Sequence, residues 1–149
     1  MLLAPSGLGA DVSDIIGRGW TFPIGLTRRG PTLTGGEDKV RQSIWIVLST
    51  RRGERVMVPE FGCGIHDLVF AANTPQLHGL VVVQVREALT RWEPRIDVLD
   101  ITAEAPADAR NHLILSIDCR LRSNNALFNL VYPFFLNEGP DMPGARRAA

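Results

Sequence analysis

Three glutamates have the side chains that acid–base catalysis requires. In a glycoside hydrolase, two carboxyl groups face each other across a cleft, and one has a raised pKa so that it can donate a proton. Glu60, Glu93 and Glu104 are candidates by residue type, but their positions in the sequence fix no distance between them. The chain has 16 acidic residues, so a set of this kind is expected by chance. The glutamates alone therefore do not indicate a glycosidase.

The cysteine and histidine residues give no stronger indication of a catalytic site or a metal site. Cys63 and His66 have a spacing that metal ligands can adopt, but a structural zinc site needs four ligands and a catalytic site three. His78 and His112 lie in other segments, and nothing groups them with Cys63. No phosphate-binding pattern follows the turn at residues 62–64, and nothing indicates a lowered thiol pKa. We therefore predict no catalytic residue, no metal, no cofactor and no enzymatic activity.

The overall charge and composition narrow the range of partners. Sixteen basic residues balance sixteen acidic ones, whereas nucleic acid and anionic membranes favour a basic excess. No apolar run approaches the roughly 20 residues that span a bilayer. The N-terminus lacks the basic region of a signal peptide, and Cys63 and Cys119 are far apart in the sequence. We expect assembly in the cytoplasm with reduced thiols, no nucleic-acid partner and no membrane insertion.

The chain divides into three parts. Residues 1–36 are rich in glycine and proline, which predicts an irregular N-terminal extension. The extension still contains apolar residues that need burial against this chain or a partner: Ile15, Ile16, Trp20, Phe22 and Ile24. Residues 37–139 are predicted to form a single domain, and residues 140–149 a flexible tail. A chain of 149 residues is long enough for one domain with a hydrophobic core.

Two helices are predicted at the start of this domain. Apolar residues at spacings of three and four predict a helix over residues 37–50, with Val40, Ile44, Val47 and Leu48 buried. Trp45 and Ile46 lie off that stripe, so they either widen the core contact or face a partner. Thr74 is a suitable N-cap and Pro75 fits the first helical position, which predicts a second helix ending near Glu93, before Pro94.

Three strands are predicted after the second helix. Residues 99–105 and 113–121 alternate between apolar and polar side chains, as in half-buried antiparallel strands, and Leu99, Ile101, Ala103 and Ala105 are expected on one face. The last strand, residues 126–136, is apolar on both faces, and Pro133 favours a sheet edge. Either this chain covers that edge or a partner adds a strand to it. The predicted fold is α+β, with two main helices packed on a small, largely antiparallel sheet that ends in an exposed C-terminal edge strand.

Several short segments resemble a known protein family. They are Gly19-Trp20-Thr21-Phe22-Pro23, Gly53-Glu54-Arg55-Val56-Met57, Pro59-Glu60-Phe61-Gly62-Cys63-Gly64 and Trp92-Glu93-Pro94-Arg95. In this order, over about residues 17–136, they are similar to the lysozyme-like baseplate wedge proteins of contractile-tailed phages. Relatives occur in type VI secretion systems and in extracellular contractile injection particles.

The resemblance implies a structural role in a sixfold baseplate that contains several copies of the chain. It implies that Glu93, Pro94 and Arg95 dock onto a helical bundle of the larger wedge proteins. It also implies that the first sheath ring adds strands to the C-terminal sheet, at residues Leu127, Phe128, Leu130, Val131, Tyr132 and Phe134. Hub or tube proteins are further expected partners. The particle would be a phage tail, a released particle or a membrane-docked secretion system.

The residues themselves support two of these implications. Glu93 and Arg95 flank a proline that ends a helix, so both charges would sit at a rigid corner; the alternative is a salt bridge within the chain. On this basis Glu93→Ala or Arg95→Ala is expected to leave a folded protein that fails to co-purify with the wedge. The terminal strand is the second point of agreement, because a strand that is apolar on both faces is what a strand-accepting edge should look like. Proline at Leu130 is therefore expected to block sheath growth while leaving wedge docking largely intact.

Two other functions remain open at this point. The lysozyme-like name allows a muramidase, which would hydrolyse purified peptidoglycan in a turbidity assay. Related folds also bind response regulators, so a regulatory adaptor is possible, and its gene would lack sheath and tube genes nearby.

Overall fold

The fold was obtained from a computed structural model, which describes residues 17–28, 30–107 and 111–136. The predicted tail, residues 140–149, lies outside this part, as do Ile15 and Ile16. Among the described residues, no helix has both the length and the apolar character needed to span a membrane. The boundaries of the single domain stay a prediction.

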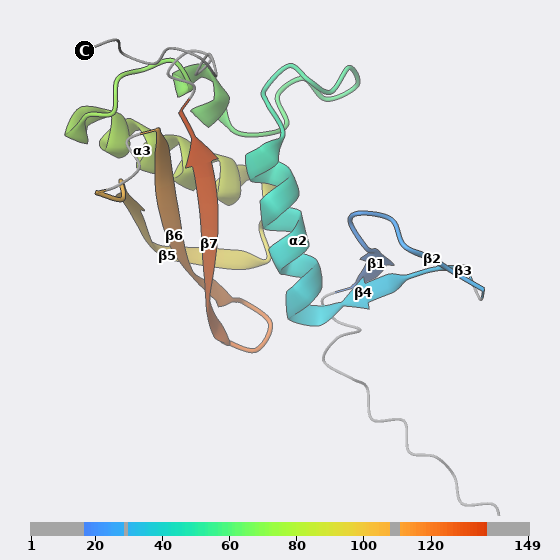
Figure 1. Ribbon diagram of the computed structural model, residues 1–149. Coiled ribbons are helices and arrows are strands. Elements are labelled where there is room, and N and C mark those ends of the chain that lie inside the picture. The colour runs from blue at the N-terminus through green and yellow to red at the C-terminus, as the bar shows by residue number, and fades with distance from the viewer. Residues whose placement is uncertain (1–16, 29, 108–110, 137–149) are drawn as a thin grey trace, which may run out of the picture.

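A three-stranded antiparallel sheet and two helices form the domain, which confirms the α+β prediction (Figure 1). The sheet contains β5 (Ile96–Glu104), β6 (His112–Leu121) and β7 (Leu127–Phe135), in that order. Figure 1 shows α3 (Pro75–Trp92) behind the sheet and α2 (Gly36–Ser49) alongside β7. A 3-10 helix, η1 (Gly64–Leu68), precedes α3.

Both helices have the predicted ends and buried faces. The hydroxyl oxygen of Thr74 accepts a hydrogen bond from the backbone N–H of Leu77 at 3.3 Å, and Pro75 is the first helical residue of α3. Glu93 caps the other end of α3, where Pro94 stops the helix. The predicted stripe of α2 is fully buried, as are the main apolar positions of α3: Val40, Ile44, Val47 and Leu48, then Leu77, Val81, Val85, Ala88 and Leu89.

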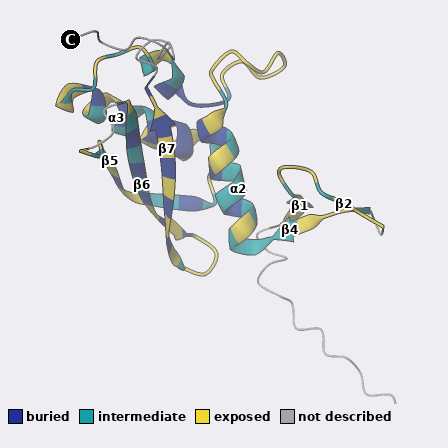
Figure 2. Cartoon of the chain, viewed as in Figure 1, coloured by how far each residue is buried: buried dark blue, intermediate teal, exposed yellow. Residues whose placement is uncertain are grey.

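The central strand β6 contributes the middle of the core. Its odd-numbered side chains from Leu113 to Leu121 are buried against the helices, and its even-numbered ones lie on the other face (Figure 2). This confirms the alternation predicted for residues 113–121. Cys119 is one of the buried side chains, as its position in the apolar series indicated, and burial raises its pKa to about 11.

Strand β5 differs from its prediction in its bounds and in which side chains share a face. It begins earlier, at Ile96, and ends at Glu104, so Ala105 lies beyond it and is exposed. Its register with β6 shifts between Val98 and Asp100. This bulge places Leu99 on the exposed side, while Ile101 is buried. The prediction that Leu99 and Ile101 share a face is therefore wrong, because one extra residue in the strand reverses the alternation.

The segment expected to be irregular contains short strand pairs. Strand β1 (Arg18–Trp20) pairs with β4 (Leu33–Gly35), and β2 (Leu26–Thr27) pairs with β3 (Gly30–Pro31). These pairs project from the start of α2, away from the sheet (Figure 1). The ammonium of Lys39 donates to the carbonyl of Trp20 at 2.8 Å, which fastens this arm to α2. The apolar residues of the arm are largely exposed: Trp20, Phe22, Ile24, Leu26 and Leu33.

Candidate partner-binding surfaces

Glu93 lies buried at the end of α3 and binds Arg95 within the chain. Its carboxylate accepts two hydrogen bonds from Arg95, from Nε at 2.6 Å and from Nη2 at 2.7 Å. Only 1% of Glu93 is exposed, whereas the Arg95 side chain is about one-third exposed. Burial alone would raise the pKa of Glu93, but hydrogen bonds from Arg95 and Ser43 outweigh it, so the pKa lies below its ordinary value. Glu93 is therefore an anion at neutral pH.

The backbone at this corner is held at three points. The N–H of Glu93 donates to the carbonyl of Leu89 at 2.9 Å, and the carbonyl of Glu93 accepts from Ile96 at 3.3 Å. The carbonyl of Arg95 accepts from the N–H of Arg122 at 3.0 Å, which fastens the corner to the end of β6. The predicted rigid corner is present.

The corner does not present both charges outward as expected. Pro94 is exposed and Arg95 partly so, but the Glu93 carboxylate faces inward, because an ion pair within the chain satisfies it. For Glu93, the alternative stated in the sequence analysis is the one observed: a salt bridge within the chain at the end of the helix. Partner binding by Glu93, Pro94 and Arg95 stays a prediction, in which Pro94 and the outer edge of Arg95 supply the contact surface.

Two of the segments that carry the family resemblance meet beside this corner. The ring of Phe61 packs against Trp92 with centroids 5.2 Å apart. The guanidinium of Arg55 lies 3.7 Å from the centre of the Phe61 ring, and that of Arg91 lies 5.0 Å from the centre of Trp92. Glu60 forms an ion pair with Arg91. The loop before η1 is thus held to the end of α3 by a tilted ring contact, by cations over the rings and by the Glu60–Arg91 ion pair.

The three candidate glutamates do not form a catalytic pair. Glu60 is held by Arg91, and Glu93 has a lowered pKa where a general acid needs a raised one. Glu104 is the last residue of β5, a strand of nine residues that begins at Ile96, just after the corner that contains Glu93. At about 3.3 Å per residue, that strand separates Glu93 from Glu104 by well over 20 Å, far beyond the roughly 10 Å limit of a glycosidase pair.

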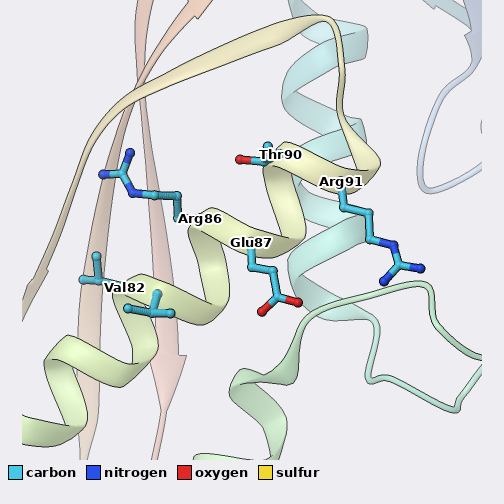
Figure 3. Close-up of a pocket in the computed structure, with 6 residues that line it drawn as sticks. Val82, Arg86, Glu87, Thr90 and Arg91 are labelled. Carbon is cyan, nitrogen blue, oxygen red and sulfur yellow. The ribbon is translucent and has the colours of Figure 1, made fainter.

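A shallow hollow on the exposed side of α3 offers no such pair either (Figure 3). Among the described residues that line it, Glu87 is the one carboxylate, and it lies 3.3 Å from Arg52. The other lining residues are valines, arginines and a threonine: Val82, Val83, Arg86, Thr90 and Arg91. A single carboxylate in an ion pair is typical of a solvated helix face.

Cys63 and His66 serve the packing of the loop. The Cys63 thiol donates to the carbonyl of Gln84 at 3.6 Å, and Nε2 of His66 lies 2.8 Å from the carbonyl of Leu48. Burial raises the pKa of Cys63, which opposes nucleophilic activity. Within the described residues, no group of three or more His, Cys, Asp and Glu side chains could hold a metal ion.

Strand β7 is an edge strand of its sheet, as Pro133 indicated. Its side chains alternate strictly between buried and exposed, although both faces are apolar in sequence. Of the six residues predicted to take part in strand exchange, Leu127 and Val131 are exposed. The other four belong to this chain's own core: Phe128, Leu130, Tyr132 and Phe134. Their side chains therefore do not face a partner from the outer surface of the sheet.

The ladder between β6 and β7 fixes which backbone groups face outward. Leu121 donates to the carbonyl of Ala126 at 2.8 Å, and Leu136 donates to Asn111 at 2.7 Å. Since hydrogen-bonded pairs alternate in an antiparallel ladder, the even-numbered residues of β7 bind β6. The odd-numbered residues direct their backbone groups away from β6: Leu127, Asn129, Val131, Pro133 and Phe135.

The two edges of the sheet differ in how well they could accept another strand. At β5, the bulge after Val98 disrupts the line of backbone groups. An arginine occupies one edge carbonyl on each side, Arg86 at Val98 and Arg41 at Asn129, so the bulge is what distinguishes the two edges. At β7 the register is continuous, and the exposed side chains of Val131 and Phe135 flank the free backbone groups. Strand β7 is thus the better acceptor of the two.

Comparison with known proteins places the chain in a family. The sequence pattern of a family described as baseplate wedge protein gp25 matches residues 34–126, more than half of the chain. The chain belongs to this family. Relatives in the wedge family are baseplate components of contractile injection systems, so the resemblance found in the sequence is confirmed.

Individual relatives are consistent with this family assignment. Baseplate wedge protein gp25 of Enterobacteria phage T4 is 35% identical over 66 residues, 44% of this chain and half of the phage protein's length. A Geobacter sulfurreducens structure, proposed to be a tail lysozyme, is 49% identical with a TM-score of 0.67, covering 72% of this chain and 97% of that one. A chain of the anti-feeding prophage baseplate shares the fold, with 24% identity, a TM-score of 0.62, and 87% and 93% of the two chains covered.

Three contacts at the candidate surfaces could not be assigned from the sequence. Ser43 on α2 helps to hold the Glu93 carboxylate. The rings of Phe61 and Trp92, which both lie in segments that carry the family resemblance, pack against each other beside the corner. Arg41 on α2 donates from Nη1 to the outward carbonyl of Asn129 at 2.8 Å. The first and last depend on how α2 lies against α3 and β7, which no local pattern in the wedge sequence encodes.

Proposed function

We propose that the chain is a structural wedge component that docks on larger baseplate proteins and gives the first sheath ring an edge for strand addition. The observation that supports this most directly is the row of outward backbone groups on β7, flanked by the exposed Val131 and Phe135. A strand that pairs there would acquire a fixed register, which later rings could copy. No catalysis and no cofactor enter this mechanism.

Proline at Val131 is the sharpest test of the strand-addition step. The N–H of Val131 faces away from β6, so V131P removes a donor from the free edge and leaves the ladder intact. Pro133 already occupies the equivalent outward position two residues along. We expect a folded protein and the loss of assembled sheath, counted by electron microscopy of particles from cells that carry the variant.

The control for this test is Val131→Thr, which keeps both the β-branched shape and the N–H. Proline at Leu130 is a poor choice, because the N–H of Leu130 faces β6 and its loss would damage the chain's own sheet. Full-length sheaths assembled on V131P would refute strand addition at β7.

Docking on the larger wedge proteins is best tested at Pro94. This residue is exposed at the apex of the corner and takes no part in the ion pair below it. Pro94→Glu adds a charge that would be desolvated in an interface, so we expect co-purification with the larger wedge proteins to fall at least tenfold. Ala105→Glu, exposed near the far end of β5, is the matched control and should co-purify normally. Equal recovery of both variants would argue against the corner as the docking site.

One observation favours the muramidase alternative: the similar Geobacter sulfurreducens protein was proposed to be a tail lysozyme. The site does not support muramidase activity. Glu93 has a lowered pKa, which opposes a role as general acid, and it lies far from Glu104. An ordinary catalytic arrangement would need a second carboxylate close to a protonated one. We therefore favour the structural role.

The remaining partners follow from membership of a baseplate. We propose several copies of the chain in a sixfold assembly with larger wedge proteins, the sheath protein, and hub or tube proteins nearby. Assembly in the cytoplasm, without nucleic acid and without membrane insertion, agrees with the balanced charge of the chain. The apolar arm around Trp20 and Phe22 is exposed and suits burial against a neighbouring baseplate protein.

A further inference from the structure

Arg41 occupies one outward carbonyl of the β7 edge. Its Nη1 donates to the carbonyl of Asn129 at 2.8 Å, and its guanidinium carbon lies 4.8 Å from the centre of the Phe128 ring. Glu37, one helical turn earlier, holds the same guanidinium through Nε at 2.9 Å and Nη2 at 2.7 Å. Contacts with Asn129 and Phe128 therefore place Arg41 against the first half of β7, and Glu37 on α2 holds it there.

The Asn129 side chain is also held in place. Its amide donates to the carboxylate of Asp118 on β6 at 2.7 Å, across the outer face of the sheet. In an antiparallel ladder, an incoming residue opposite Asn129 would have to donate its N–H to the same carbonyl that Arg41 occupies. Arg41 occupies the side of this carbonyl from which a second strand would approach, so an incoming N–H has to compete with the guanidinium.

The second half of the edge has no such obstruction among the residues that the structure describes. Val131 and Phe135 each offer an N–H and a carbonyl, and Pro133 offers a carbonyl alone. On the inner side of this half, Trp45 packs edge-on against Tyr132 with ring centroids 4.7 Å apart and keeps 40% of its surface exposed. An incoming segment with apolar side chains could cover Trp45 on one face and Val131 on the other.

We infer that Arg41 confines the added strand to residues 131–135 of β7 and so sets where the partner's strand begins. This rests on the proposed function, because the occupant is an extended, apolar arm of the sheath protein. Arg41 is a specificity-determining residue here: it excludes pairings shifted toward Leu127, which would bring the wrong side chains over Trp45. The opposite edge has a similar device, since Arg86 of α3 donates to Val98.

The test uses the full-length, isotope-labelled chain and synthetic peptides that copy the terminal arms of the sheath protein of the same injection system. Amide exchange measured by NMR should show that the peptide protects the N–H groups of Val131 and Phe135, and leaves those of Leu127 and Asn129 unprotected. Arg41→Met keeps the aliphatic stem and removes the donor. We expect protection to extend to Asn129 and binding to become roughly three- to tenfold tighter, the effect of one or two released hydrogen bonds.

Two further variants make the outcome decisive. Arg86→Met makes the same change at the opposite edge and should leave peptide binding unchanged. Glu37→Gln loosens Arg41 without removing it and should give an intermediate gain. If peptides bind but protect all four amides equally, or if Arg41→Met binds no tighter, the role of Arg41 is overturned and strand addition survives. If no sheath-arm peptide binds to the wild-type chain or to Arg41→Met, both are overturned.

Discussion

Replacing Glu93 by alanine is expected to lower the free energy of unfolding by about 3 kcal/mol, because the change leaves Arg95 without its carboxylate in a partly buried site. The substitution also empties a space that is 99% shielded from solvent and removes an acceptor for Ser43. For a chain of this size, the melting temperature should fall by about 10 °C in a thermal unfolding experiment. Poor co-purification of Glu93→Ala with the wedge would thus reflect stability as well as docking.

Glu93→Gln separates charge from shape. The lowered pKa of Glu93 means that its ion pair stabilises the fold above the unfolded value of about 4.3, and that this contribution is lost as the pH falls through the lower folded value. The wild-type chain should therefore lose stability on acidification more steeply than Glu93→Gln. Asp97, whose pKa is lowered by hydrogen bonds from Arg120 and Arg122, titrates in both proteins, so the difference between the two curves reports Glu93. Parallel curves would show that the ion pair does not stabilise the fold.

The elements of the fold could be predicted from local pattern because each has a local cause. Thr74 and Pro75 define the start of α3, and Pro94 defines its end. The strict alternation from Leu113 to Leu121 needs only a one-sided core. Leu99 could not be placed in this way, because the bulge that turns it outward arises from pairing with β6.

The candidate surfaces were only partly predictable for the same reason. Pro133 locates an edge strand, since it lacks an N–H, but the direction of each remaining N–H depends on the register with β6. Glu93 and Arg95 could be recognised as a rigid pair, but whether the carboxylate faces inward depends on Ser43 from a helix 50 residues earlier. The sequence therefore indicates which segments matter, and the packing decides which atoms remain available.

Gly62 is the position where adding a single methyl group should do most damage. Its φ is +112°, a conformation that side chains with a Cβ rarely adopt. A Cβ there would lie 2.3 Å from the carbonyl oxygen of Thr50 and 2.9 Å from its carbon, both backbone atoms at the end of α2. The same Thr50 carbonyl accepts the N–H of Cys63 at 2.9 Å, so it cannot move away without breaking that bond.

Gly62→Ala is therefore expected to lower the free energy of unfolding by about 4 kcal/mol, the sum of backbone strain and a steric clash that must be relieved. Gly53→Ala is the matched control: its φ is +84°, but no other atom lies within 4 Å of its added Cβ, so it bears the strain alone, about 1 to 2 kcal/mol. Urea unfolding of both variants measures the difference. Equal losses would mean that the turn at residues 59–63 does not press on α2. A much larger loss for Gly62→Ala would show that this turn packs closely against the end of α2, beside the ring contact of Phe61 and Trp92.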